Sequence, residues 1–332
     1  MSILDLKRRL FPKGIKRAAR SQWRRWFDRV TERDLAAAIG RLGIPDGAWV
    51  CIHSQLSALG YLPGGPRIVI DALRARVPGC TVLMPTFPFS GTALAHLESD
   101  PLYDPRTTPS ASGVLSEALR QYPGAVRSLH PTHPCVAVGP EAEALIEGSE
   151  RAETPFGPDS AYGRYAQSPK AWQLLIHTNS TSIVHEFQEA ADMPNLFLPE
   201  QYTARGLDWE GREQRYQIKV HTPLLPLFVA TPEYVWFPDY ALPFPPAKRE
   251  HLIARMHDKE AARRIVERHE ELKKAGVFRE ARAGAALLMA VEVAPWRERI
   301  VRDVRESIHQ YPERYSVQAV TEAKARGELI TT

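Results

Sequence analysis

The sequence predicts an α/β protein with a central mixed, partly parallel sheet and flanking helices. Apolar runs at 48–53 and 81–85 are typical of buried strands, and a helix is expected between them at 67–76. A strand, helix, strand order favours parallel pairing with the helix packed on the sheet. Further strands are predicted at 133–138 and 172–177.

Capping signals indicate where the first helix begins. Residues 31–34 (Thr-Glu-Arg-Asp) offer a threonine N-cap with side-chain support, and Gly43 is expected to end this helix after Leu42. Towards the other end of the chain, a charged stretch at 247–275 and a last helix at about 295–310 predict a C-terminal helical subdomain.

Positive charge is concentrated in the first thirty residues. Residues 1–30 hold ten Lys or Arg and two Asp or Glu, a charge of +8, whereas the whole chain carries +4. Apolar residues, among them Trp23 and Trp26, interleave with these cations and predict a basic amphipathic helical arm. Such an arm suits a membrane surface, or packing on the body or on a second subunit of a homodimer. Nucleic acid is not an expected partner.

The remainder, 31–332, is expected to form a single domain, because no repeat or obvious linker interrupts it. Within it, the region at about 195–245 is rich in Pro, Tyr, Phe and Trp. This composition predicts loops and antiparallel strands, such as 215–220 and 226–229.

Cysteine usage and hydropathy point to the cytoplasm. Cys51, Cys80 and Cys135 show no metal-ligand spacing and leave an odd thiol in any disulfide scheme, which favours a reducing compartment. No apolar run approaches the roughly 18 to 20 residues that a membrane span needs. The basic N-terminus also lacks the features of a secretory signal.

Polar residues follow the first expected strand, at 53–60, where Ser54, Ser57 and Gly60 lie in a small turn. Backbone amides in such turns bind phosphate groups well, although most of these turns bind nothing. The chain has neither a Walker lysine nor a Gly-x-Gly-x-x-Gly motif. Nucleotide hydrolysis and dinucleotide redox chemistry are therefore poorly supported.

Two histidines and an arginine lie close together in segment 127–134. His130 and His133 are three residues apart and follow Arg127, a pattern that indicates a functional site. An equally good interpretation is structural, with both rings bonded to backbone at proline turns.

A small polar loop enters a helix that carries His185. Positions three and four apart share a helix face, so Gln188 and Glu189 are both expected to reach the His185 ring. A carboxylate there would fix the tautomer and stabilise the imidazolium, which improves histidine as a base. The metalloprotease motif His-Glu-x-x-His is not satisfied, since Glu189 stands where its second histidine belongs. Alone, a histidine near a helix end is more often structural.

Taken in order, six segments resemble the aminoglycoside 3-N-acetyltransferase family, also called the antibiotic N-acetyltransferases. The family shows His-Ser-Ser-Leu-Ser-x-x-Gly, Met-Pro-Thr, Thr-Pro-Ser-x-x-Gly, Arg-Ser-x-His-Pro, Pro-Phe-Gly and Thr-Ser-Leu-His-x-x-Glu. The counterparts here are residues 53–60, 84–86, 108–113, 127–131, 155–157 and 181–189. The resemblance covers roughly residues 31–195.

The resemblance implies direct acetyl transfer from acetyl-CoA to an amine of an aminoglycoside, amino sugar or related natural product. The implied reaction involves no covalent enzyme intermediate and no metal. It makes His185 the general base with Glu189 and Gln188 beside it, and places the acceptor at about 195–245. The residues that it places along the cofactor groove are Ser54, Gln55, Leu56, Ser57, Gly60, Arg127 and Ser128.

Three positions depart from the family pattern. Gln188 stands where the family has glutamate, Gln55 replaces a serine of the cofactor segment, and Pro134 occupies another serine position. A neutral amide at 188 orients the ring without stabilising its positive charge. Either Glu189 takes over, or the acceptor needs a weaker base, or the usual reaction is lost.

Two other classes of protein remain open from the residues alone. A metal-dependent hydrolase would use His130, His133, His185 and Glu189, although these residues lack a standard ligand spacing. A non-catalytic, membrane-tethered binding protein would act through residues 1–30.

Overall fold

The computed structural model describes residues 28–178, 181–193, 196–221, 267 and 270–307. Nearly all of the predicted basic arm at 1–30 therefore lies outside the described residues. So do the strand expected at 226–229 and most of the charged stretch at 247–275. The division into arm, domain and subdomain stays a prediction.

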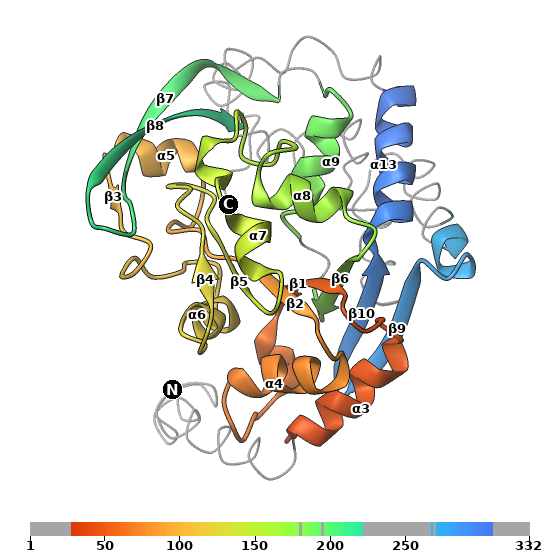
Figure 1. The fold of residues 1–332 in the computed structure, drawn as a ribbon. Helices are drawn as coiled ribbons and strands as arrows, with labels where there is room; N and C mark the ends of the chain where they lie inside the picture. Colours follow the sequence, from red (N-terminus) through yellow and green to blue (C-terminus); the bar gives the residue numbers. More distant parts are fainter. Residues whose placement is uncertain (1–27, 179–180, 194–195, 222–266, 268–269, 308–332) are drawn as a thin grey trace, which may run out of the picture.

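A seven-stranded sheet in the order β4-β5-β2-β1-β6-β10-β9 forms the centre of the protein (Figure 1). The three middle strands are parallel, and the outer strands pair antiparallel. This arrangement confirms the mixed, partly parallel sheet. The strands are β1 (Trp49–Ser54), β2 (Thr81–Pro85), β4 (Val126–Arg127), β5 (Cys135–Val138), β6 (Ala171–Ile176), β9 (Phe278–Ala283) and β10 (Ala286–Glu292).

Helices cover both faces of this sheet (Figure 1). Because successive strand side chains point to opposite faces, Val50 and Ile52 of β1 belong to one core cluster and Cys51 to the other. The first cluster packs on α3 (Glu32–Leu42), α4 (Arg67–Arg76) and α6 (Val114–Arg120). The second packs on α7 (Ala142–Ile146), α8 (Ala161–Gln167), α9 (Val184–Ala190) and α13 (Val293–Ser307).

Local capping chemistry sets the ends of α3. The Thr31 hydroxyl accepts from the Asp34 backbone N–H, and the Asp34 carboxylate accepts from the Thr31 N–H at 2.9 Å, which completes a capping box. Gly43 ends the helix in the left-handed region at φ 62°, where a side chain would be strained. The predicted first helix is confirmed at both ends.

Three strands of the main sheet, β4, β9 and β10, are absent from the sequence-based expectation. β10 lies antiparallel to β6 and β9, and Ala286–Val291 are all buried. Such a run has no polar alternation to mark it as a strand. The helix expected at about 295–310 begins slightly earlier, at Val293.

A smaller sheet in the order β3-β7-β8 lies beside the main one and packs on α5 (Ala93–Glu98) (Figure 1). Its main part is the hairpin of β7 (Phe197–Leu207) and β8 (Glu213–His221), and β3 (Leu102–Tyr103) pairs with β7. The strand predicted at 215–220 lies within β8. Of the helices in the described ranges, none is long and apolar enough to span a bilayer.

Candidate active site

One edge of the main sheet gathers the segments that the sequence singled out. β1, β2 and β6 are parallel, and β4 runs the same way because both it and β2 pair antiparallel with β5. The carboxyl ends of these four strands therefore share an edge, which is where open α/β sheets bind ligands.

His53 fastens the loop that leads into α9 to the end of β1. The backbone N–H of Ser182 donates to His53 Nε2 at 3.0 Å, and the Thr181 hydroxyl lies 3.3 Å from Nδ1. Burial lowers the pKa of His53 to about 4. This first residue of the family-like segment therefore has a structural position, and it helps to place the helix that carries His185.

His185 lies in the first turn of α9, and its ring is oriented by Gln188. The two residues are joined by a hydrogen bond of 2.9 Å between His185 Nδ1 and Gln188 Oε1. An amide oxygen only accepts, so Nδ1 carries the proton and Nε2 keeps its lone pair. Burial and the neighbouring His221 lower the pKa of His185 to about 4, against opposite effects of Gln188 and Glu189.

Glu189 makes its hydrogen bonds elsewhere. Its carboxylate accepts from the Thr154 hydroxyl, from the Phe156 backbone N–H at 3.2 Å and from His221 Nε2 at 2.8 Å. In the described part of the chain it has no hydrogen bond to His185. The sequence expectation that both side chains would reach that ring holds for Gln188, while Glu189 acts on His185 only through its charge.

Sequence reasoning missed His221, the last residue of β8. Its ring centroid lies 5.1 Å from that of His185, and both imidazoles pack against the ring of Phe156. Phe156 comes from the Pro-Phe-Gly segment and also lies 5.3 Å from the ring of His133. No local signal pointed to His221, because the hairpin register alone brings it here.

The two histidines of segment 127–134 lie in contact, with ring centroids 5.8 Å apart, but they have different surroundings. His130 is buried, and its Nδ1 accepts the backbone N–H groups of Thr132 and His133 at 3.3 and 3.0 Å, which supports the structural interpretation. The His133 ring instead packs edge-on against the ring of Phe156. Among the residues that the structure describes, no group of three or more His, Cys, Asp or Glu is arranged to hold a metal ion.

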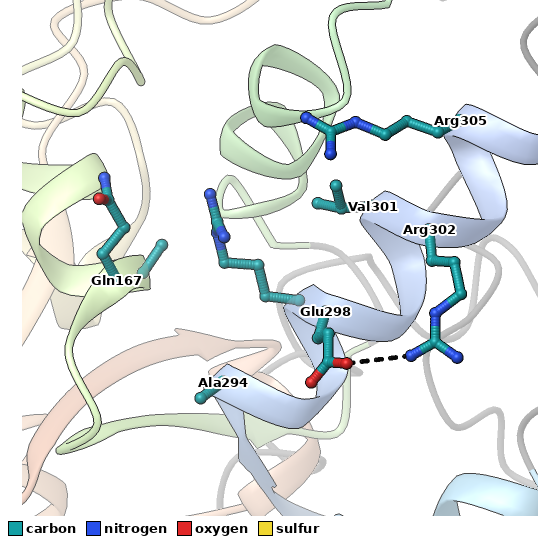
Figure 2. A pocket seen from close by; sticks show the side chains of 8 residues that line it. Gln167, Ala294, Glu298, Val301, Arg302 and Arg305 are labelled. Carbon is teal, nitrogen blue, oxygen red and sulfur yellow. Dashed lines mark hydrogen bonds and ion pairs between the residues drawn. The ribbon is translucent and has the colours of Figure 1, made fainter.

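A buried ion pair anchors α9 to α13. Arg297 bonds both carboxylate oxygens of Glu186 at 2.7 to 3.0 Å, and Arg305 donates to the carbonyl of Ala190 at the end of α9. Figure 2 shows the cavity beside these arginines, about 740 Å³, between α8 and α13. A third arginine in it, Arg302, pairs with Glu298, so acidic partners offset the positive charge of this cavity.

The proposed cofactor segment follows β1. Ser54 ends the strand, the Gln55 N–H continues the pairing with β6 by donating to the Ile176 carbonyl at 2.9 Å, and Leu56–Leu59 form a 3₁₀ turn. Gly60 has φ 76°, and a Cβ there would collide with the backbone of Asp28. This glycine is therefore required by chain packing.

Arg127 and Ser128, at the end of β4, are buried and already bonded. The Arg127 guanidinium donates to the Thr86 hydroxyl and carbonyl at 3.0 and 2.8 Å, and to the Thr108 carbonyl. The Ser128 hydroxyl accepts from the Cys135 N–H at 3.0 Å. These bonds fasten three loops at the same sheet edge as Ser54, with β5 and β2 lying between the two sites.

The fold and this edge define an α/β protein with a histidine-bearing helix at the carboxyl ends of a mixed sheet. The sequence model of the aminoglycoside 3-N-acetyltransferase family matches residues 51–305, and the chain belongs to that family.

Three known proteins illustrate the similarity. Aminoglycoside N(3)-acetyltransferase VIII of Streptomyces fradiae is 34% identical over 180 residues, which span 50% of this chain and 63% of that relative. A crystal structure of aminoglycoside acetyltransferase AAC(3)-Xa is 27% identical with a TM-score of 0.63, covering 84% of this chain and 94% of that one. A binary complex of AAC-IIIb with CoASH shares the fold at 22% identity and a TM-score of 0.62, covering 84% and 97%.

Proposed function

We propose that this protein is an acetyl-CoA-dependent N-acetyltransferase that acts on an amine of an aminoglycoside, amino sugar or related natural product. The observation that carries the proposal is the His185 ring, held with its Nε2 lone pair available, in a chain of this family. A base with a free lone pair is what a protonated amine requires before it attacks a thioester.

In the proposed reaction His185 Nε2 takes a proton from the acceptor amine. The amine nitrogen forms a bond to the acetyl carbonyl carbon, the carbon–sulfur bond breaks, and the thiolate of CoA receives a proton. Gln188 keeps His185 in the required tautomer throughout, because its oxygen holds the proton on Nδ1.

The turn after β1 supports a place for acetyl-CoA. Gln55 and Ser57 are exposed, and Ser54 is half-buried. Leu56 and Gly60 complete this turn, and Arg127 and Ser128 stiffen the same sheet edge from the other side of β2. One relative of the same fold is a complex with CoASH, which supports CoA as the co-substrate.

The surroundings of the reaction follow from the same proposal. Acetyl-CoA is a metabolite of the cytoplasm, so we place the enzyme there, with residues 1–30 in peripheral contact with the inner membrane surface. Assembly as a homodimer is a further proposal. Neither metal nor nucleic acid is needed for the proton transfer that His185 performs.

Purified protein with acetyl-CoA and a panel of amines tests this function. The panel contains several aminoglycosides, simple amino sugars and an amine-free sugar as a blank, and both released thiol and product mass are measured. Acetylated product with any amine supports the proposal. If the amine-free sugar releases as much thiol as the amines do, the protein only hydrolyses acetyl-CoA, and the proposed function is contradicted.

A further inference from the structure

Two imidazoles lie side by side in this site, and a side-chain oxygen orients each. The oxygen on His185 belongs to the amide of Gln188, and the oxygen on His221 belongs to the carboxylate of Glu189. The ring centroids are 5.1 Å apart. Only the second pair has the negative charge that stabilises an imidazolium.

The Glu189 side chain is held in a fixed position by burial and by two hydrogen-bond donors. Its side chain is 8% exposed, and the Thr154 hydroxyl and the Phe156 N–H both donate to it, so its oxygens are fixed towards His221. Donation from His221 Nε2 to this carboxylate leaves Nδ1 of the same ring with a lone pair. The Phe156 ring packs on both imidazoles and keeps them together.

We propose that His221 and Glu189 form a second imidazole–carboxylate pair that holds the proton His185 removes from the acceptor amine. This inference rests on the proposed function. It explains how a chain with glutamine at 188 keeps a carboxylate in the proton path: the charge has moved by one residue along α9, and β8 supplies a second ring to meet it.

Every proton in this scheme has a donor and an acceptor. His185 Nε2 takes the proton from the amine and passes it, directly or through one water, to His221 Nδ1. His221 then releases its own Nε2 proton to the Glu189 carboxylate, so the ring stays neutral and Glu189 holds the extra proton. When the carbon–sulfur bond breaks, the proton returns by the same path to the CoA thiolate, and the site is regenerated.

The electrostatics of the site favour Glu189 as the group that attracts the proton. Burial raises the pKa of Glu189 to about 7, against the hydrogen bonds from Thr154 and Phe156, whereas burial lowers that of His221 to about 3. The other titratable groups that act on the pair are His185 of α9, His133 of the loop before β5, and Lys219 of β8.

Moving the charge along α9 tests the pair. Glu189→Gln keeps the size of the side chain and removes its charge, so we expect kcat to fall about 100-fold while KM for acetyl-CoA changes little. Adding Gln188→Glu places a carboxylate directly on His185, and we expect the double variant to recover about tenfold of that loss. Glu298→Gln, on the exposed face of α13, is the matched control.

Two results would overturn the proposal. One is a Glu189→Gln variant with kcat within about twofold of wild type. The other is a double variant no faster than Glu189→Gln, which would mean that Glu189 only holds the Thr154 and Phe156 loop. Thr154→Val distinguishes the role of the Glu189 charge from its role in holding this loop. The variant removes one hydrogen bond between the loop and Glu189 and leaves the charge in place.

Nitrogen NMR of the histidine side chains gives a readout independent of catalysis. We expect His221 in the Nε2–H tautomer, and a lower pKa of His221 in Glu189→Gln than in wild type. An Nδ1–H tautomer, or an unchanged His221 pKa, would contradict the pair. If no amine is acetylated by wild type, the proposed function fails while this NMR result still decides on the pair.

Discussion

Arg297 donates hydrogen bonds to both carboxylate oxygens of Glu186, at distances of 2.7 to 3.0 Å, and so fixes the residue next to His185. The Glu186 side chain is only 4% exposed, and that of Arg297 is 26% exposed. Burial raises the pKa of Glu186, and Arg297 opposes this rise. Loss of either charge leaves its partner poorly solvated.

Glu186→Gln should therefore lower the free energy of unfolding by about 2 to 3 kcal/mol, near the lower end for breaking a buried pair because Arg297 is partly exposed. Denaturant unfolding measures the change. Glu298→Gln removes an exposed ion pair with Arg302 and should cost no more than about 0.5 kcal/mol. Equal losses in the two variants would contradict the anchoring role of Arg297.

Protonation of the buried His130 ring makes the free energy of unfolding depend on pH. Burial lowers its folded pKa from 6.5 to about 4, and its Nδ1 accepts two backbone N–H groups, which a protonated ring cannot do. Since the folded pKa lies below the unfolded value, stability is complete above pH 6.5 and declines as pH falls towards 4.

The expected loss from His130 is about 3 kcal/mol over this interval. His53 changes stability in the same direction, so wild type must be compared with His130→Asn, whose side-chain oxygen can accept the same N–H groups. The melting temperature of the variant should fall less steeply between pH 6.5 and 4. Parallel curves would show that the His130 ring does not titrate in this range.

Gln188→Glu should change the pH dependence of turnover. A carboxylate beside His185 stabilises its imidazolium and raises the pKa of the ring by about one to two units. Because His185 must be neutral to act as a base, the rising limb of kcat/KM should move to higher pH by a similar amount. An unmoved limb would mean that His185 does not control the rate.

Arg127→Lys should unfold more easily than wild type. The guanidinium donates to Thr86 and Thr108 from several nitrogens, and an ammonium cannot reproduce this fork. We expect a loss of about 2 to 4 kcal/mol by denaturant unfolding. In the folded variant KM for acetyl-CoA should stay within about threefold, and a larger rise would show that Arg127 also contacts the cofactor.

The sequence predicted the parts of the fold that local chemistry decides. Thr31, Asp34 and Gly43 cap a helix through their own side chains and backbone, so they were readable without the fold. β10 was not predicted, because a fully buried strand shows no alternation and one of its two partners, β6, lies more than a hundred residues away.

The candidate site shows the same limit. Helical spacing placed Gln188 and Glu189 on the face of His185, but spacing alone could not decide which of them meets the ring. The decision comes from Thr154, Phe156 and His221, which hold the carboxylate away from His185. These partners come from other elements, and only the tertiary structure brings them together.

The most direct test of the central claim is the rate of acetyl transfer by His185→Ala at saturating acetyl-CoA, with the best acceptor of the amine panel. Removing a general base should lower kcat by about 10² to 10⁴. His96→Ala, on α5, controls for the loss of a histidine, and melting curves confirm that both variants are folded. Wild-type turnover by His185→Ala would contradict the role of His185 as the base.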